Sequence, residues 1–187
     1  MSAAGALGLL GGAFDPPHNG HVALARDAVR QLALGGLVVL VVADPGHKAV
    51  QASAADRLAL AGVAFPGQRV VLDSHGRTVD MLRDGSWEDP VFLVGADEFV
   101  DFPAWKEPDG VLELARLGVA SRPGYPRERF AAVLESLRQP ERVLFFEIEP
   151  LPVSSSEVRR LLAAGDRVEG LVPDAVAAEI EARGLYR

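Results

Sequence analysis

The order of short apolar runs and helical stretches constrains the fold of this chain more than any other feature. Runs rich in leucine and β-branched residues alternate with stretches of helical apolar spacing, an order typical of a parallel sheet with crossover helices. Buried strands are expected at Leu7 to Leu10, Leu37 to Val42, Arg69 to Leu72, Val91 to Val94, Gly118 to Ser121 and Val143 to Glu147. The sequence therefore predicts an α/β fold.

Helical patterns fill several of the intervals and close the chain. The clearest runs from Phe130 to Leu137, where apolar residues fall at i, i+3, i+4 and i+7 and would share one face. Another helix is expected to begin at Ser53, because Ser53 and Asp56 resemble a weakened capping box. The last two are predicted at Ser156 to Ala164 and at Pro173 to about Arg183.

The length of the chain suits one hydrophobic core. It has 187 residues, and single cores usually hold about 100–200. No repeat, low-complexity tract or linker breaks the pattern of strands and helices. We therefore predict one domain over residues 1–187, a Rossmann-like doubly wound parallel sheet with flanking helices.

Charge and composition exclude several classes of protein. The formal net charge is −7 and there is no basic stripe, so a nucleic-acid partner is not expected. The longest uncharged apolar run, Leu32 to Ala43, is shorter than the roughly 20 residues that cross a bilayer. The apolar start has no basic leader, since the first lysine or arginine is Arg26. Cysteine is absent, which rules out disulfides and thiolate chemistry and fits a reducing cytoplasm.

A glycine-rich segment follows the first predicted strand and precedes a helix. At the carboxyl edge of a parallel sheet, such a junction directs free backbone N–H groups and a positive helix end at an anion. Gly11 and Gly12 would let the main chain approach a phosphate, and His18 and His21 could both donate hydrogen bonds to its oxygens. A glycine pair at such a turn is often only architecture. Two histidines, an Asp-Pro pair and three glycines within eleven residues favour a functional site.

A second candidate segment, Val153 to Arg159, begins the helix predicted near Ser156. Taken alone, it is better explained as a serine N-cap followed by a surface arginine. Hydroxyls, free N–H groups and a guanidinium at one helix start also suit a triphosphate. Because two such segments lie far apart in one chain, we expect them to converge on a single ligand.

Both segments resemble motifs of one enzyme family. Gly11 to His21 resembles the G-G-x-F-D-P-x-H-x-G-H signature of bacterial nicotinate mononucleotide adenylyltransferases, within the H-x-G-H nucleotidyltransferase superfamily. Val153 to Arg159 resembles I-S-S-T-x-I-R, with Ser156 in place of threonine. Three weaker matches lie between these two segments. His47-Lys48 resembles P-P-H-K, with Gly46 replacing a proline, and the segment Val94 to Asp97, with Trp105 downstream, resembles I-G-x-D and its following tryptophan. The segment Arg122 to Tyr125 matches R-P-G-Y. By themselves a His-Lys pair is usually solvated surface, Asp97 a helix cap and Trp105 core.

The resemblance implies transfer of an adenylyl group from ATP to nicotinate mononucleotide in NAD biosynthesis, with Mg²⁺ bound through the ATP phosphates and no metal ligands in the protein. It assigns catalysis to His18, His21, Lys48 and Arg159. It assigns ATP binding to Gly11, Gly12, Phe14, His18, Gly20, His21, Gly95, Asp97, Ser154, Ser156 and Arg159. It assigns the mononucleotide to Asp15, Asp44, Lys48, Arg77, Thr78, Trp105 and Arg122.

Departures from the family motifs concern the pyridine base. Arg77 and Met81 stand where relatives carry an aromatic residue and a threonine, and Asp44 stands where asparagine is usual. A carboxylate at Asp44 would repel nicotinate, whereas Arg77 would attract it. Alternatives are therefore nicotinamide mononucleotide, another small acceptor such as phosphopantetheine, or a nucleotide-binding regulatory module without catalysis. The sequence leaves the oligomeric state open, a homo-oligomer included.

Overall fold

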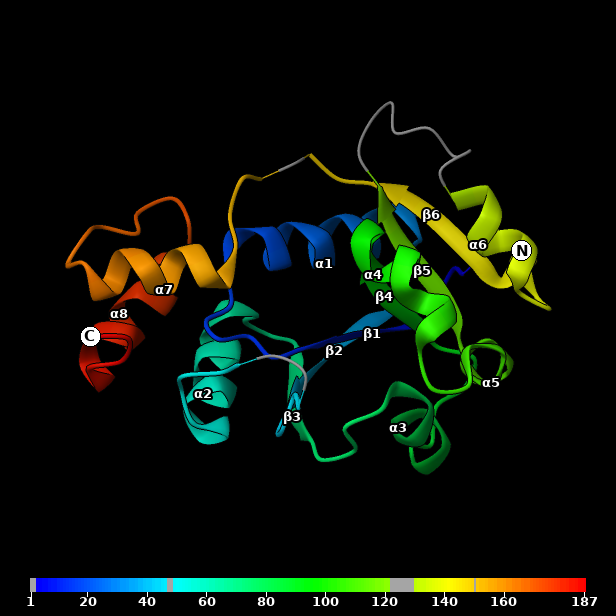
Figure 1. Ribbon diagram of the computed structural model, residues 1–187, viewed down its shortest axis with the longest axis horizontal. Coiled ribbons are helices and arrows are strands. Elements are labelled where there is room, and N and C mark those ends of the chain that lie inside the picture. The colour runs from blue at the N-terminus through cyan, green and yellow to red at the C-terminus, as the bar shows by residue number, and fades with distance from the viewer. Residues whose placement is uncertain (1–2, 47–48, 122–129, 150) are drawn as a thin grey trace.

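A single parallel sheet forms the centre of the protein (Figure 1). The computed structural model describes residues 3–46, 49–121, 130–149 and 151–187. Its strands are β1 (Leu7–Gly12), β2 (Gly36–Val42), β3 (Arg69–Asp73), β4 (Val91–Gly95), β5 (Arg116–Ser121) and β6 (Val143–Glu147). All six predicted strands are confirmed, and β1 extends two residues further than expected, through Gly11 and Gly12.

The strand order is β3-β2-β1-β4-β5-β6, and each neighbouring pair is parallel. This is the order of a doubly wound Rossmann-like sheet, which confirms the predicted fold class. The chain runs outward from β1 to β3, returns, and continues outward from β4 to β6. Ligands of such sheets bind beyond the carboxyl ends of the strands where the order reverses, here between β1 and β4.

Helices connect the strands and close the chain. They are α1 (Asn19–Gln31), α2 (Ala54–Ala64), α3 (Thr78–Asp84), α4 (Ala96–Asp101), α5 (Pro108–Leu114), α6 (Ala131–Ser136), α7 (Ser155–Ala163) and α8 (Asp174–Arg183), with 3-10 turns η1 (Phe102–Ala104) and η3 (Pro140–Arg142). The predicted cap of α2 is present, because Ser53 Oγ accepts from Asp56 N at 3.1 Å. The reciprocal half differs from a capping box, since the Asp56 carboxylate accepts from the Ser53 hydroxyl.

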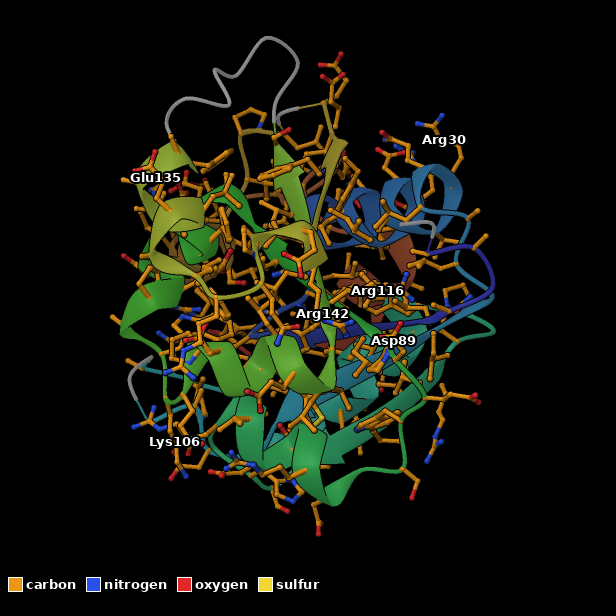
Figure 2. The ribbon with its side chains drawn as sticks, turned by 90° about the vertical axis from the view of Figure 1, so that its right-hand side faces the viewer. Arg30, Asp89, Lys106, Arg116, Glu135 and Arg142 are labelled. Atoms are coloured by element: carbon orange, nitrogen blue, oxygen red, sulfur yellow. The ribbon has the colours of Figure 1, made fainter. Side chains whose placement is uncertain are left out.

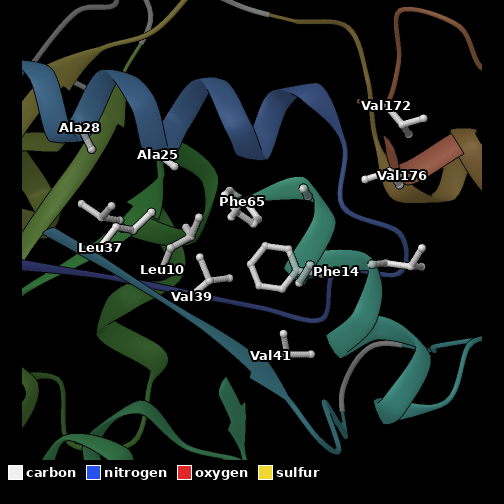
Figure 3. Close-up of a cluster of buried hydrophobic side chains, with 14 of the residues drawn as sticks. Leu10, Phe14, Ala25, Ala28, Leu37, Val39, Val41, Phe65, Val172 and Val176 are labelled. Carbon is white, nitrogen blue, oxygen red and sulfur yellow. The ribbon is translucent and has the colours of Figure 1, made fainter. Parts of the chain in front are cut away.

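Alternation along the strands divides the core into two layers. In β2, Val39 and Val41 pack with residues of α1, α2 and α8, whereas Val38 and Leu40 pack with residues of α3 and α5. Successive side chains of a strand point to opposite faces, so a sheet covered on both sides needs apolar residues throughout. Figure 3 shows the first layer, in which the ring of Phe14 lies near Val39, Val41 and α2.

Charged side chains fasten the amino ends of three strands. Asp89, just before β4, forms ion pairs with Arg116 at the start of β5 (3.2 Å) and Arg142 before β6 (2.6 Å). The three lie together in Figure 2. This cluster lies at the opposite edge of the sheet from the switch point, so it secures strand register without taking part in the cavity described below.

The last two helices lie beyond the carboxyl edge of the sheet, where α7 begins beside the start of α1 and α8 packs against α2 (Figure 1). Asn19, the first residue of α1, donates through its side chain to Gly170 O at 2.8 Å. The C-terminal segment thus forms part of the wall around the sheet's carboxyl edge. No helix in the described ranges is long and apolar enough to cross a membrane.

Candidate active site

A cavity of about 1360 Å³ opens at the carboxyl edge of β1 and β4, at the switch point. Pockets for one small ligand usually measure about 300–1,000 Å³, so this cavity has room for two. Its wall draws on both predicted segments and on α3 and η1. Of the predicted residues, those lining it are Gly11, Gly12, Phe14, Asp15, His18, His21, Arg77, Thr78, Gly95, Trp105, Ser156 and Arg159.

Gly11 and Gly12 leave room for two aromatic rings where a side chain would collide with them. A Cβ added at Gly11 would lie 3.1 Å from the Phe92 ring, and one at Gly12 would lie 3.0 Å from the Phe14 ring. Both contacts are tighter than normal packing allows. Close backbone approach to phosphate was the predicted reason for these glycines, and the structure adds ring packing as a second. The Phe14 side chain is buried, with 1% of its surface exposed, and supports the loop from beneath.

His18 and His21 form a stacked pair at the start of α1. Their ring centroids are 3.7 Å apart, and His21 Nδ1 accepts from His18 N at 3.1 Å. A neutral imidazole that accepts at Nδ1 carries its proton on Nε2, so His21 keeps an Nε2–H donor. Gly20 does not line the cavity, but a Cβ there would lie 3.0 Å from the His18 ring. The glycine between the histidines therefore makes room for the first imidazole.

Burial keeps His18 neutral. Desolvation lowers its pKa from 6.5 to about 4, and its Nδ1 is buried without a hydrogen-bond partner in the described part of the chain. A buried polar atom left unpaired costs free energy that a ligand can recover. His18 thus offers a polar nitrogen atom at the cavity wall rather than a fixed positive charge.

The start of α7 lies against the first segment, as predicted. Ser155 Oγ donates to Pro16 O at 2.8 Å, and Arg159 Nη1 donates to Asp15 O at 2.6 Å. Arg159 also donates to Ser156 Oγ at 3.2 Å, and both line the cavity. Ser154 is instead the N-cap of α7, accepting from Glu157 N, and it lies outside the cavity wall. Ser155, which carried no prediction, takes its place in the wall.

The Asp15 carboxylate faces the protein. It is 2% exposed and accepts from Gln51 N (2.7 Å), Ala52 N (3.0 Å) and Tyr186 Oη (2.7 Å). The Arg159 guanidinium lies 3.6 Å from its Oδ2. A carboxylate with these partners is suited to holding the loop in place, which differs from the substrate contact that the sequence predicted.

The predicted residues for the pyridine base and ribose separate into two groups. Arg77, Thr78 and Trp105 line the cavity, from the start of α3 and the end of η1. Asp44 and Asp97 are exposed and lie outside its wall, and the Asp44 carboxylate accepts from Gly46 N at 3.1 Å. The remaining two predicted residues, Lys48 and Arg122, lie outside the described ranges, so their roles stay predictions.

Sequence reasoning missed several polar residues in the wall, namely Asp73, Glu98, Asp101, Lys106 and Ser155. Glu98 stands one position after the predicted Asp97, and its carboxylate accepts from Gly95 N at 3.0 Å. Lys106 is paired with Asp80 at 2.8 Å. The places of Asp73, at the end of β3, and of Glu98 and Asp101, in the helix after β4, could have been inferred from the rule that ligands meet the carboxyl ends of strands.

A buried arginine secures the base of the cavity. Arg57 in α2 is 1% exposed and donates to carbonyl oxygens of Ala13 (2.8 Å), Val42 (2.7 Å), Ala43 (2.7 Å) and Ala52 (3.2 Å). These carbonyls belong to three separate segments, so one guanidinium joins the loops after β1 and β2 to the segment before α2. The sequence does carry a sign of this role, since Arg57 precedes Leu60 and Ala61 on the apolar stripe of α2.

Comparison with known proteins agrees with this geometry. Residues 9–161 match the model of the cytidylyltransferase-like family. A probable nicotinate-nucleotide adenylyltransferase of Bordetella avium is 35% identical over 97% of this chain and 98% of its own length. A relative of the same description from Thermus thermophilus is 38% identical over 97% of this chain and 99% of its own length.

Solved structures show the same fold. The nicotinic acid mononucleotide adenylyltransferase of Plasmodium falciparum complexed with NaAD has a TM-score of 0.73 at 17% sequence identity, covering 96% of each chain. A second structure of that protein, complexed with APC, has a TM-score of 0.70 at 16% identity, again over 96% of each chain.

Proposed function

The chain belongs to the nicotinate-nucleotide adenylyltransferase family of nucleotidyltransferases, and we propose that it transfers the adenylyl group of ATP to nicotinate mononucleotide. The products are nicotinate adenine dinucleotide and pyrophosphate. One observation carries the proposal: His18 and His21 share a cavity with Ser156 and Arg159, although the two pairs lie far apart in sequence.

The reaction needs alignment more than proton transfer. A 5′-phosphate oxygen of the mononucleotide attacks the α-phosphorus of ATP, and the bond from that phosphorus to the oxygen bridging to the β-phosphate breaks. The nucleophile is already ionised at neutral pH, so no general base is required. The protein's contribution is to hold both substrates in line and to stabilise charge on the transferred and leaving groups.

We assign roles along the cavity wall. His18 and His21 would donate hydrogen bonds to the α-phosphoryl oxygens. A neutral His18 suits this role, because the reaction requires a hydrogen bond and no proton transfer from the imidazole. Ser156 and Arg159 would bind the β- and γ-phosphates. Trp105, which also lines the cavity, would stack on the pyridine ring. Lys48 would assist at the phosphates, on the strength of the resemblance alone.

Mg²⁺ fits this site as a companion of the nucleotide. Among the described residues no three His, Asp or Glu side chains are grouped as metal ligands, and Mg²⁺ usually binds through substrate phosphates with few carboxylates. Asp73, Glu98 and Asp101 in the wall could hold its water ligands. The ion would neutralise charge on the phosphates of ATP.

The placement of two charged residues favours nicotinate over nicotinamide. Arg77 lines the cavity and can attract the nicotinate carboxylate. Asp44, the residue expected to oppose it, lies outside the wall and is engaged with Gly46 N. Both side chains are exposed, so solvent and salt screen both charges, and the attraction by Arg77 should dominate because only Arg77 lines the cavity.

The test is a side-by-side assay of pyrophosphate release from ATP and Mg²⁺ with nicotinate or nicotinamide mononucleotide. We expect Arg77→Gln to lower kcat/KM for nicotinate mononucleotide about 10- to 100-fold, as for loss of a charged hydrogen bond, with little change for the amide. Arg83→Gln is the matched control, because Arg83 lies on the same helix, pairs with Glu107 and stays outside the cavity.

The outcomes separate the two parts of the proposal. No pyrophosphate with either mononucleotide, but release with phosphopantetheine or another acceptor, would refute the assigned substrate. ATP binding without release for every acceptor would point to a regulatory module. An unchanged preference in Arg77→Gln would refute the role of Arg77 alone. The compartment we propose is the cytoplasm, since a chain without cysteine suits a reducing environment.

A further inference from the structure

Tyr186, close to the C-terminal end of the sequence, contacts the glycine-rich segment Gly11 to His21. Tyr186 is 8% exposed, and its hydroxyl donates to Asp15 Oδ1 at 2.7 Å, across 171 positions of sequence. A buried tyrosine hydroxyl usually finds a hydrogen-bond partner, and here the partner is the carboxylate of Asp15, a residue that lines the cavity.

The Asp15 carboxylate links Tyr186 to the segment before α2 and to Arg159 in the cavity wall. One oxygen accepts from Ala52 N as well as from Tyr186, and the other accepts from Gln51 N. The Arg159 guanidinium is fixed on the same residue, with Nη1 2.6 Å from its backbone oxygen and 3.6 Å from Oδ2. Any rotation of the Asp15 carboxylate would thus alter the surroundings of the arginine that faces the cavity.

We propose that Tyr186 is a positioning residue for ATP: its hydroxyl orients the Asp15 carboxylate, which in turn holds Arg159 in the geometry that binds the triphosphate. The proposal rests on the proposed function, because it assigns Arg159 to ATP. Tyr186 itself does not line the cavity, so it acts through Asp15 and not on the substrate.

The electrostatics of the contact suit a permanent donor. Burial, together with the neighbouring Asp15, raises the pKa of the Tyr186 phenol far above its usual value. The hydroxyl therefore stays protonated through the range near pH 10 in which a free tyrosine ionises. A donor of this kind orients Asp15 without itself responding to pH.

The position of Tyr186 predicts an effect on one substrate and not the other. The C-terminus lies beside α7, α8 and α2, away from α3 and α5 in Figure 1. Arg77 and Thr78, our candidates for the mononucleotide, stand at the start of α3. Loss of the hydroxyl should therefore weaken ATP binding and leave mononucleotide binding nearly unchanged.

Three variants separate positioning from packing. Tyr186→Phe removes only the hydroxyl. Leu185→Ala is the packing control, because Leu185 lies against the same apolar cluster and makes no contact with Asp15 in the described residues. Removal of Arg187, which is exposed, tests whether a change next to Tyr186 that spares its hydroxyl affects binding. Each is assayed for kcat and for KM of both substrates, for Tm, and for the Kd of a non-hydrolysable ATP analogue.

For Tyr186→Phe we expect KM for ATP and Kd for the analogue to rise about three- to thirtyfold, the range for residues that act through a neighbour. KM for the mononucleotide should stay within about twofold of wild type. Leu185→Ala should lower Tm without changing Kd for the analogue, and removal of Arg187 should change neither.

Two results would overturn the proposal. One is an unchanged analogue Kd in Tyr186→Phe, whatever happens to its Tm. The other is an equal rise in Kd in Leu185→Ala, which would reduce the tyrosine to a packing residue. Failure of the proposed function is distinct from both, because it would appear as a wild-type protein that binds the analogue and releases no pyrophosphate.

Discussion

His21 has two separable tasks, and two substitutions distinguish them. Its Nδ1 accepts from His18 N at 3.1 Å, which caps α1, and in the proposed function its Nε2–H donates to the α-phosphate of ATP in the cavity that His21 lines. His21→Ala removes both groups. His21→Asn keeps an oxygen near the position of Nδ1, and so keeps the cap, but it has no atom at the position of Nε2.

The magnitudes follow from the two contacts. Losing the cap should cost about 1 kcal/mol, which lowers Tm by about 2–4 °C in a chain of this size. Losing a preorganised donor to the transition state should lower kcat about 10²- to 10³-fold. His21→Ala should therefore lose both activity and some stability, whereas His21→Asn should lose a similar factor in kcat at nearly wild-type Tm.

The assay is pyrophosphate release at saturating ATP and nicotinate mononucleotide, with Tm from thermal denaturation followed by circular dichroism. Turnover near wild type in His21→Ala would refute the donor role. Full turnover in His21→Asn would contradict it as well, since only the cap is retained there. A large fall in Tm for His21→Asn would show that the cap geometry is wrong.

Three further predictions concern stability and loop geometry. The pKa of His18 is about 4 in the folded protein and 6.5 in the unfolded chain, so its contribution to the free energy of unfolding is fully present above pH 6.5 and is lost as pH falls through 4. The total loss is roughly 3 kcal/mol. Urea midpoints should fall over that pH window, and His18→Gln should flatten the dependence of the midpoint on pH. Arg57→Met should lower the free energy of unfolding by at least about 3 kcal/mol in urea titrations, because it leaves buried carbonyl oxygens unpaired. Arg57→Lys should restore little of this loss. A loss under about 1 kcal/mol in Arg57→Met would contradict the buried contacts. Gly20→Ala should reduce kcat by displacing the His18 ring. The control is Gly62→Ala, in open space on α2, which should raise the free energy of unfolding by about 0.5–1 kcal/mol and leave kcat unchanged. Equal kcat values in the two variants would refute the steric argument.

The sheet was predictable from sequence because its pattern is redundant. The central strands β2 and β4 are nearly continuous apolar runs, since a sheet covered on both faces needs apolar residues on both sides of each strand. The helices α3, α4 and α5, which the sequence pattern does not predict, have seven, six and seven residues, about two turns each. The equally short α6 was predicted because its apolar spacing continues beyond both ends, from Phe130 to Leu137. The existence of α3, α4 and α5 depends on packing against the sheet rather than on a local pattern.

The site was predictable where its residues belong to continuous motifs. His18, His21, Ser156 and Arg159 were inferred from two short segments, and they do line one cavity. The supports behind them were not predictable in this way. Tyr186 meets Asp15 across 171 positions, and nothing local to either residue encodes that contact. The inward orientation of Asp15 follows from these distant partners.

The central claim is that the loop after β1 and the start of α7 bind one triphosphate. A crystal structure of the protein with a non-hydrolysable ATP analogue and Mg²⁺ tests it most directly. The account predicts phosphate oxygens within hydrogen-bond distance of the His18 or His21 imidazole and, in the same molecule, of the Arg159 guanidinium. A nucleotide whose phosphates contact only one of these segments, or that binds outside this cavity, would contradict it.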